Sequence, residues 1–221
     1  MMARKLLFLW VLVLGSACMG WGGSCQTGSL AAYMAPGFSC TLGSLTFSTF
    51  FYTGTATNST PLSASQITVT PTGTSLLLEG PWSAGLGQST DSIINYTVTG
   101  SGAVLTGVDI SMLGFSIVEG GVISVSSTAL GDGTLLALLN YAQSGGLSTS
   151  SSAGFDAVPG LQMTTNISLT GDNGQADLSY IDDDWTPLST TPEAASMLLF
   201  GSGLAGVVLL LRRHRSRARL I

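Results

Sequence analysis

The residues that could do chemistry in this chain are mostly carboxylates, and the usual partners of a catalytic carboxylate are missing. The only histidine is His214, which lies among arginines near the end of the sequence. A Ser/His/Asp triad or a Cys/His pair needs a histidine beside its nucleophile, so neither can form in the long interval before it. A P-loop needs a lysine after its glycines, and the only lysine, Lys5, stands near the start.

Glycoside hydrolysis needs only two carboxylates, and four carboxylates on strand-like segments could in principle supply them. They are Glu79, Asp91, Asp109 and Glu119. Nothing in their spacing selects a pair, and scattered carboxylates on strands are usually solvated. We therefore expect that the protein is not an enzyme and that it needs no cofactor.

Two acidic segments offer oxygen ligands on turns, which calcium prefers. One is Asp172-Asn173-Gly174 with Asp177, and the other is Asp182-Asp183-Asp184. Neither has the spacing of an EF-hand loop. Because Asn-Gly favours a tight type I′ turn, we expect the first segment to be a hairpin turn and the second a solvated run. Calcium binding stays an alternative.

The charges of the chain are strongly segregated. No basic residue lies between Leu6 and Leu211, whereas all twelve acidic residues lie in that interval. Binding to nucleic acid is therefore disfavoured, since no cation is available to neutralise phosphate. Cations and neutral sugars remain open as ligands. Trp82 and Trp185 could stack on sugar rings if they were exposed, although we expect Trp82 to belong to the core.

The first twenty-four residues have the pattern of a secretory signal peptide. Arg4 and Lys5 precede the apolar run 6–14, and the small residues 15–17 follow it. The run is too short for a comfortable membrane span. We expect cleavage after Ala17, with a site near Ser24 as the alternative. The protein is therefore expected to be exported.

Export places the remaining cysteines in an oxidising environment, where a disulfide is the first expectation. Cys25 and Cys40 are predicted to form it, and closing this loop would stabilise the fold by roughly 3 kcal/mol. Cys18 lies in a sequence slightly like a lipidation site, so lipidation there is an alternative. A metal site is not expected, because the exported part has no histidine and no CxxC spacing.

Residues 25–181 read as one antiparallel β-sandwich or jelly roll. Short runs of β-branched and aromatic residues alternate with Gly-rich turns, which is typical of these all-β folds. Gly107 and Gly114 predict bulges, or a break between two strands, in the longest run. The run 135–141 is ambiguous between strand and helix. The expected strands are 44–52, 66–70, 75–79, 92–99, 103–118, 122–128, 134–141, 162–170 and 176–181.

The C-terminal part of the chain has three sections after the sandwich. Residues 182–191 are expected to form an extended, exposed linker, because they hold Pro187 and several hydroxyl residues. The uncharged apolar run 194–211 would reach about 27 Å as a helix, close to a hydrocarbon core of about 30 Å. We predict one transmembrane helix here. The basic end 212–221 predicts a cytoplasmic C-terminus through five arginines: Arg212, Arg213, Arg215, Arg217 and Arg219.

The order Thr191-Pro192-Glu193, apolar helix and arginine-rich end resembles the PEP-CTERM sorting signal of Gram-negative bacteria. The family usually has a second proline where this chain has Ala194. The resemblance implies that exosortase, a membrane-embedded cysteine protease, recognises Pro192 and Glu193 and cleaves near them. Residues 192–221 would then be a sorting tail that is removed.

The same resemblance implies an exported protein of the cell surface or extracellular matrix, linked to exopolysaccharide and biofilm. Before processing it would be a single-pass membrane protein of the inner membrane. The alternative is a carbohydrate- or calcium-binding β-sandwich that stays anchored in the membrane.

Overall fold

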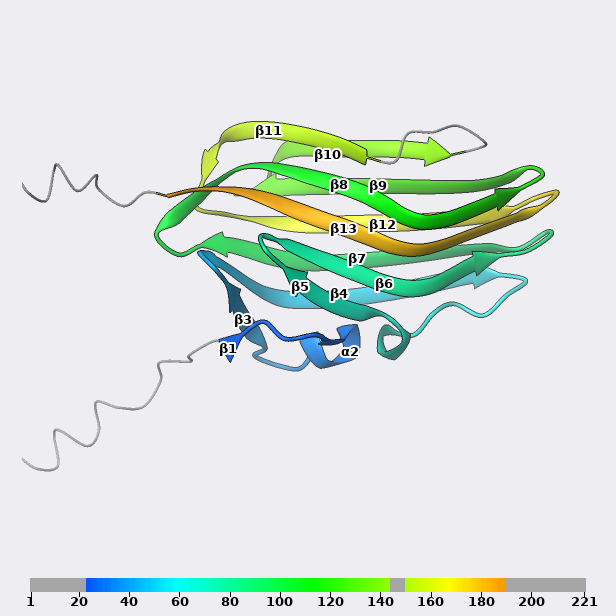
Figure 1. Ribbon diagram of the computed structural model, residues 1–221, viewed down its shortest axis with the longest axis horizontal. Helices are drawn as coiled ribbons and strands as arrows, with labels where there is room; N and C mark the ends of the chain where they lie inside the picture. The colour runs from blue at the N-terminus through cyan, green and yellow to red at the C-terminus, as the bar shows by residue number, and fades with distance from the viewer. Residues whose placement is uncertain (1–22, 144–149, 190–221) are drawn as a thin grey trace, which may run out of the picture.

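The computed structural model describes residues 23–143 and 150–189, which form two β-sheets packed face to face (Figure 1). The described residues are mostly β-structure, and their only helical pieces are a short helix, α2 (Leu30–Tyr33), and a 3₁₀ turn, η2 (Ala64–Gln66). The predicted all-β sandwich is therefore confirmed.

The first sheet has seven strands, and its pairings are antiparallel except for the parallel pair at its β1 edge. In spatial order its strands are β1 (Gly23–Ser24), β3 (Ser39–Leu42), β4 (Leu45–Thr57), β7 (Ser89–Gly100), β12 (Gly160–Gly171), β9 (Gly121–Gly131) and β10 (Thr134–Gln143).

The second sheet has six strands and is antiparallel throughout. Strands β10 and β11, at the edges of the two sheets, contact each other, so the sandwich is partly closed on that side (Figure 1). In spatial order the strands of this sheet are β11 (Ser150–Val158), β8 (Ala103–Val118), β13 (Gln175–Ser189), β6 (Ser75–Ala84), β5 (Thr68–Thr72) and β2 (Gly28–Ser29).

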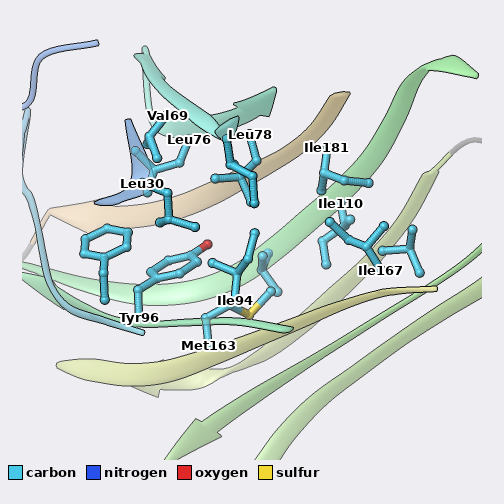
Figure 2. Packing of buried hydrophobic residues seen from close by; sticks show 14 of the residues in the cluster. Leu30, Val69, Leu76, Leu78, Ile94, Tyr96, Ile110, Met163, Ile167 and Ile181 are labelled. Atoms are coloured by element: carbon cyan, nitrogen blue, oxygen red, sulfur yellow. The ribbon is translucent and has the colours of Figure 1, made fainter. Parts of the chain in front are cut away.

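The core lies between the sheets and follows the period-2 alternation of the central strands. In β7, β9 and β12 every second side chain is buried, because successive residues of a strand point to opposite faces. Figure 2 shows these side chains meeting between the two layers. Ile94, Met163 and Ile167 of the first sheet face Leu78, Ile110 and Ile181 of the second.

The hairpin turns agree only in part with the predicted turn chemistry. Asp132 and Gly133, between β9 and β10, both have positive φ, of 48° and 75°, as a type I′ turn requires. Residues 172–174 connect β12 of the first sheet to β13 of the second, so the expected hairpin turn is wrong: the segment crosses between the two layers. The predicted type I′ conformation of Asn173-Gly174 is wrong, since neither is among the positive-φ residues of the described chain.

The prediction that the linker begins at Asp182 is also wrong. Strand β13 continues to Ser189, and its last residues still pair with β8. The cause is the alternation of Ile181, Asp183 and Trp185, which places all three side chains in the core. The sandwich therefore extends beyond the predicted boundary at residue 181.

The sequence pattern also missed or left open several elements. The short pieces α2, β1, β2 and β3 and the whole of β11 were not predicted. β11 was missed because its residues are mainly Ser, Gly and Ala, with little apolar alternation. Strand β8 is a single strand, so the alternative of a break within it is excluded. The ambiguous run 135–141 is part of strand β10.

Several predictions fall outside the described residues. They are the signal peptide up to residue 22, the recognition residues Pro192 and Glu193, the apolar helix 194–211 and the basic end. Within the described ranges, no helix has the length and apolar character needed to cross a membrane.

Candidate functional site

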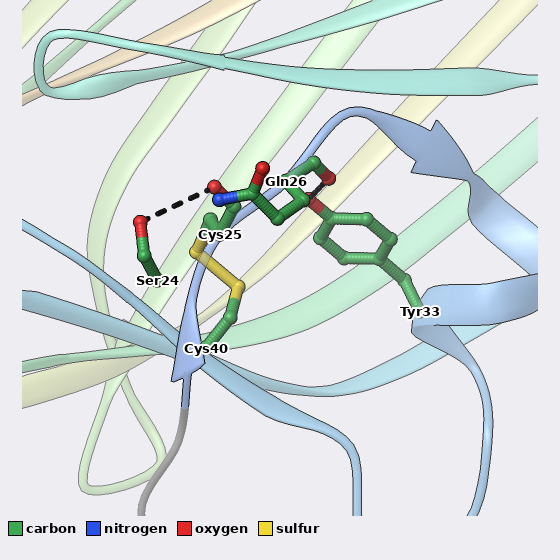
Figure 3. Close-up of a disulfide and its surroundings, with 5 residues drawn as sticks. All are labelled: Ser24, Cys25, Gln26, Tyr33 and Cys40. Carbon is green, nitrogen blue, oxygen red and sulfur yellow. Dashed lines mark hydrogen bonds between the residues drawn. A yellow bond between two sulfur atoms is a disulfide. The ribbon is translucent and has the colours of Figure 1, made fainter.

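The N-terminal segment of the sandwich is joined to strand β3 by the predicted disulfide. Cys25 and Cys40 are bonded, with their Cα atoms 4.8 Å apart (Figure 3). The backbone N–H of Cys25 also donates to the carbonyl of Thr41, at 2.9 Å. The loop between the two cysteines is therefore held against the sheet at its start and at its end.

Helix α2 lies inside this loop and is held by local polar contacts. The side chain of Ser29 caps the helix by accepting a hydrogen bond from the backbone N–H of Ala32, at 3.3 Å. The Tyr33 hydroxyl donates to the carbonyl of Gln26, at 2.6 Å (Figure 3). Leu30 and Tyr33 are buried. The helix is thus anchored from both ends although it has a single turn.

An aromatic cluster connects this loop to the main core. The ring centroid of Tyr33 lies 4.5 Å from that of Phe38 and 5.0 Å from that of Phe50. Phe50 in turn stacks on Tyr96, with an interplanar angle of 15°. Such ring pairs add to the free energy of area burial alone, so the loop is fixed by packing as well as by the disulfide.

A pocket of about 450 Å³ lies between segment 33–39 and residues 48–50 of β4. We call it the β4 pocket. Its hydroxyl groups include those of Ser48 and Thr49, and its apolar lining residues are Tyr33, Met34, Ala35, Pro36, Phe38 and Phe50. All its lining residues are uncharged. Burial raises the pKa of Tyr33, so its phenol stays neutral near physiological pH.

The backbone at the mouth of the pocket has an unusual conformation. Thr49 has a φ of 58°, which is a genuine outlier for a β-branched residue. It lies in a β-bulge, where the register between β4 and β7 shifts between Ser48 and Phe51. A residue held in this conformation costs free energy on the order of 1 kcal/mol, and such strain is typical of functional positions.

A second polar arrangement is buried in the core around Asp183. The Tyr96 hydroxyl donates to its Oδ2, at 2.7 Å, and Thr165 Oγ1 lies 3.4 Å from the same oxygen. Ser127 donates to Thr165, at 3.0 Å. Burial raises the pKa of Asp183 to about 7. Burial, and then the nearby Asp183 charge, raise the pKa of Tyr96 well above its usual value.

The two tryptophans named as possible sugar-stacking residues are both buried. Trp82 and Trp185 each expose 2% of their surface. Trp82 Nε1 donates to Ser92 Oγ, at 3.1 Å, and Ser92 is also within 3.0 Å of the Tyr52 hydroxyl. The expected core position of Trp82 is confirmed, and neither indole can stack on a sugar at the surface.

The carboxylates considered for hydrolysis do not converge. Asp91 lies on β7 in the first sheet, whereas Glu79 and Asp109 lie on β6 and β8 in the second. Glu119 lies in the turn between β8 and β9. Asp109 does have a carboxylate neighbour, since it is the cross-strand partner of Asp184.

The acidic segments considered for calcium are also dispersed. Strand alternation turns Asp183 into the core and leaves Asp184 exposed. Asp177 accepts a hydrogen bond from the side chain of Gln175, at 2.7 Å. Among the described residues, no three His, Cys, Asp or Glu side chains form a group that could hold a metal ion.

The end of the chain carries a recognisable signal. Residues 190–215 match the PEP-CTERM protein-sorting motif. The chain carries a PEP-CTERM sorting signal. This match confirms the resemblance seen in the sequence, and it indicates an exported protein with a C-terminal anchoring signal that exosortase processes.

Comparison with other known proteins adds only distant likenesses. No curated protein matches the chain. One similar solved structure is TmCBM61 in complex with β-1,4-galactotriose, at 11% identity and a TM-score of 0.32, covering 62% of this chain and 88% of that one. Another is a family 11 carbohydrate-binding module from Clostridium thermocellum, at 7% identity and a TM-score of 0.23, covering 65% and 90%. These likenesses are too distant to indicate a ligand.

The PEP-CTERM motif begins directly after the folded sandwich. Ser189, the last residue of β13, pairs with Ala103 of β8, and the motif match starts at residue 190. The pairing of β13 with β6 ends earlier, at Asp184 and Ser75. Only Thr190 and Thr191 therefore separate the last strand from Pro192, instead of the longer linker expected from the sequence.

The β4 pocket was missed by sequence reasoning. The aromatic residues Tyr33, Phe38 and Phe50 stand within or near the Cys25–Cys40 loop. An aromatic cluster next to a short disulfide loop is the signal that could have pointed to it. The backbone strain at Thr49 has no such signal, because it depends on the register with β7.

Proposed function

We propose that this chain is an exported β-sandwich protein that is first held in the inner membrane by residues 194–211 and is then released by exosortase near Pro192-Glu193. The observation that carries the proposal is the PEP-CTERM motif match at residues 190–215, directly after a complete sandwich. A signal peptide in residues 1–24 would start the export.

The distribution of charge supports this topology. The interval between Leu6 and Leu211 has no basic residue, so the five arginines after it form a strong positive block at the end of the sequence. Such a block is retained on the cytoplasmic side of a membrane. The sandwich would then lie outside, with its C-terminal strand next to the bilayer until cleavage.

The released sandwich would act at the cell surface or in the extracellular matrix, with exopolysaccharide as its partner and without catalysing a reaction. The dispersed positions of Glu79, Asp91 and Asp109 support a non-catalytic role. The neutral β4 pocket supports recognition of an uncharged ligand. The alternative is the same sandwich kept permanently in the membrane.

Mass spectrometry of the mature protein from a host that has exosortase tests the sorting proposal. We expect a C-terminus near Thr191 and recovery of the protein outside the inner membrane. An intact C-terminus at Ile221 in that host would contradict release and support a permanent anchor.

Substitutions at the motif provide the matched comparison. Pro192→Ala and Glu193→Ala should each leave the uncleaved chain in the membrane, because they remove the recognition residues without touching the described fold. Thr186→Ser, at an exposed position upstream of the motif, should be processed like the wild type. Normal processing of both motif variants would show that Pro192 and Glu193 are not what the protease reads.

A further inference from the structure

We propose that the β4 pocket binds one ring of a neutral oligosaccharide. The inference concerns the extracellular sandwich alone and goes beyond sorting, which requires nothing of this pocket. It gives the exopolysaccharide partner proposed above a specific place of contact and therefore rests on that part of the proposed function.

The walls of the pocket match the two-sided chemistry of a sugar ring. A pyranose presents apolar C–H groups on its faces and hydroxyl groups around its edge. The half-buried side chains of Met34 and Phe38 offer apolar surface for the faces, while Ser48 and Thr49 offer hydroxyl groups for the edge. The volume of about 450 Å³ lies within the range of small-molecule sites.

The absence of charge in the lining selects the class of ligand. No residue that lines the pocket carries a carboxylate, ammonium or guanidinium group. A charged ligand would lose hydration on entering and would find no opposite charge there. No lysine, arginine or histidine occurs anywhere in residues 23–189 to neutralise an anion. A neutral sugar has no charge to desolvate and needs no opposite charge in the pocket.

The pocket is preorganised, which lowers the entropic cost of binding. One wall belongs to the loop closed by the Cys25–Cys40 disulfide and fixed by the Tyr33 hydroxyl bond to Gln26 (Figure 3). The other wall includes Thr49, held in a strained conformation by the bulge of β4. Hydroxyl groups on rigid walls can be placed for a ligand without further ordering.

A polar row leads from the pocket across the first sheet. Ser39 and Ser48, which both line the pocket, are cross-strand partners. Ser48 pairs with Thr97 of β7, and Thr97 pairs with Gln162 of β12. These residues point away from the core, so further sugar units could follow the row over strands about 4.8 Å apart.

Hydrogen–deuterium exchange of the full-length chain in lipid nanodiscs tests the inference. The probes are neutral gluco-, galacto- and manno-configured tetrasaccharides at roughly 10 mM, enough to detect a Kd of about 1 mM. We expect at least one of them to slow exchange in residues 34–39 and 48–51. Cyclohexanol serves as the uncharged ring without a polyol edge, and glycerol as the polyol without a ring.

Mild substitutions locate the binding. Ser48→Ala and Thr49→Gly each remove one hydroxyl group and should weaken binding roughly three- to tenfold. Glycine is chosen at position 49 because it adopts a positive φ without strain. Gln162→Ala should weaken the binding of a tetrasaccharide but leave the binding of the matching monosaccharide unchanged. Leu86→Ala, at a turn residue that exposes 73% of its surface, is the control and should leave binding unchanged.

Three results would overturn the inference. They are no protection with any sugar, protection by cyclohexanol or glycerol alone, and equal protection in the wild type and in both pocket variants. Because the full-length chain is tested before processing, none of these results depends on whether exosortase cleaves it. Failure of the pocket and failure of sorting are therefore distinguishable.

Discussion

Asp183 is a carboxylic acid inside an apolar core without any cation to pair with. It is fully buried, and burial raises its pKa to about 7. The Tyr96 hydroxyl donates to one of its oxygens, while the other, Oδ1, has no hydrogen-bond partner among the described residues. Ionisation of this group therefore places an uncompensated charge between the sheets.

The stability of the sandwich should fall between acidic and neutral pH because of Asp183. In the unfolded chain its pKa is near the usual value of about 3.9, so the folded state holds the proton more tightly. The stabilisation is fully present below about pH 4 and is lost as the pH rises through about 7. Urea unfolding at pH 4 to 8 measures the slope of the free energy of unfolding against pH.

Asp183→Asn should remove most of this pH dependence and should raise stability at pH 8, since an amide keeps an acceptor for Tyr96 without the charge. The gain is expected to be on the order of 1 kcal/mol or more. Asp156→Asn, at an exposed position of β11, is the control and should keep the wild-type slope. An unchanged slope in Asp183→Asn would show that this group is not the source.

At the scale of elements, the register of β8 against β13 creates an unfavourable pair. Asp109 and Asp184 are direct cross-strand partners, and like charges in this position destabilise a sheet. Asp184 also accepts a hydrogen bond from Thr74, at 2.5 Å, so Asp109 is the better residue to change.

Asp109→Asn should therefore raise the free energy of unfolding by a few tenths of a kcal/mol at low salt. The gain should shrink in about 1 M salt, where screening acts over about 3 Å. Thermal unfolding at two salt concentrations checks this, with Asp156→Asn as the matched exposed control. A gain that is independent of salt would argue against repulsion as the cause.

The disulfide loop is the element on which the β4 pocket depends. Replacing Cys25 and Cys40 together by serine should lower the free energy of unfolding by roughly 3 kcal/mol. Segment 33–39 should exchange amide hydrogens faster, while the centre of the sandwich should keep its protection. Loss of protection in the centre as well would mean that the loop is required for the whole fold.

At the scale of the whole molecule, an acidic sandwich leads without a spacer into its sorting signal. Strand β13 is paired up to Ser189, and the PEP-CTERM motif begins at residue 190. The same strand carries Asp183 and Trp185 into the core. The segment that exosortase must reach therefore follows directly from one of the best-paired strands of the fold.

The sorting signal, the all-β class and the Cys25–Cys40 bond can all be predicted from the sequence without its fold. These follow from features that are local or compositional: the order of motif, apolar run and arginines, the alternation along strands, and the choice of two cysteines in an exported chain. The sequence also showed that a histidine-dependent active site is excluded before His214. None of these conclusions requires knowledge of which strands are neighbours.

Other features become visible only in the folded chain: the end of the sandwich, the burial of Asp183 and Trp185, the facing pair of Asp109 and Asp184, and the β4 pocket. Each depends on the register between strands that are far apart in the sequence. A shift of one residue reverses every side chain of a strand between core and solvent. Short-range patterns therefore leave these contacts open, and packing of the two sheets selects among them.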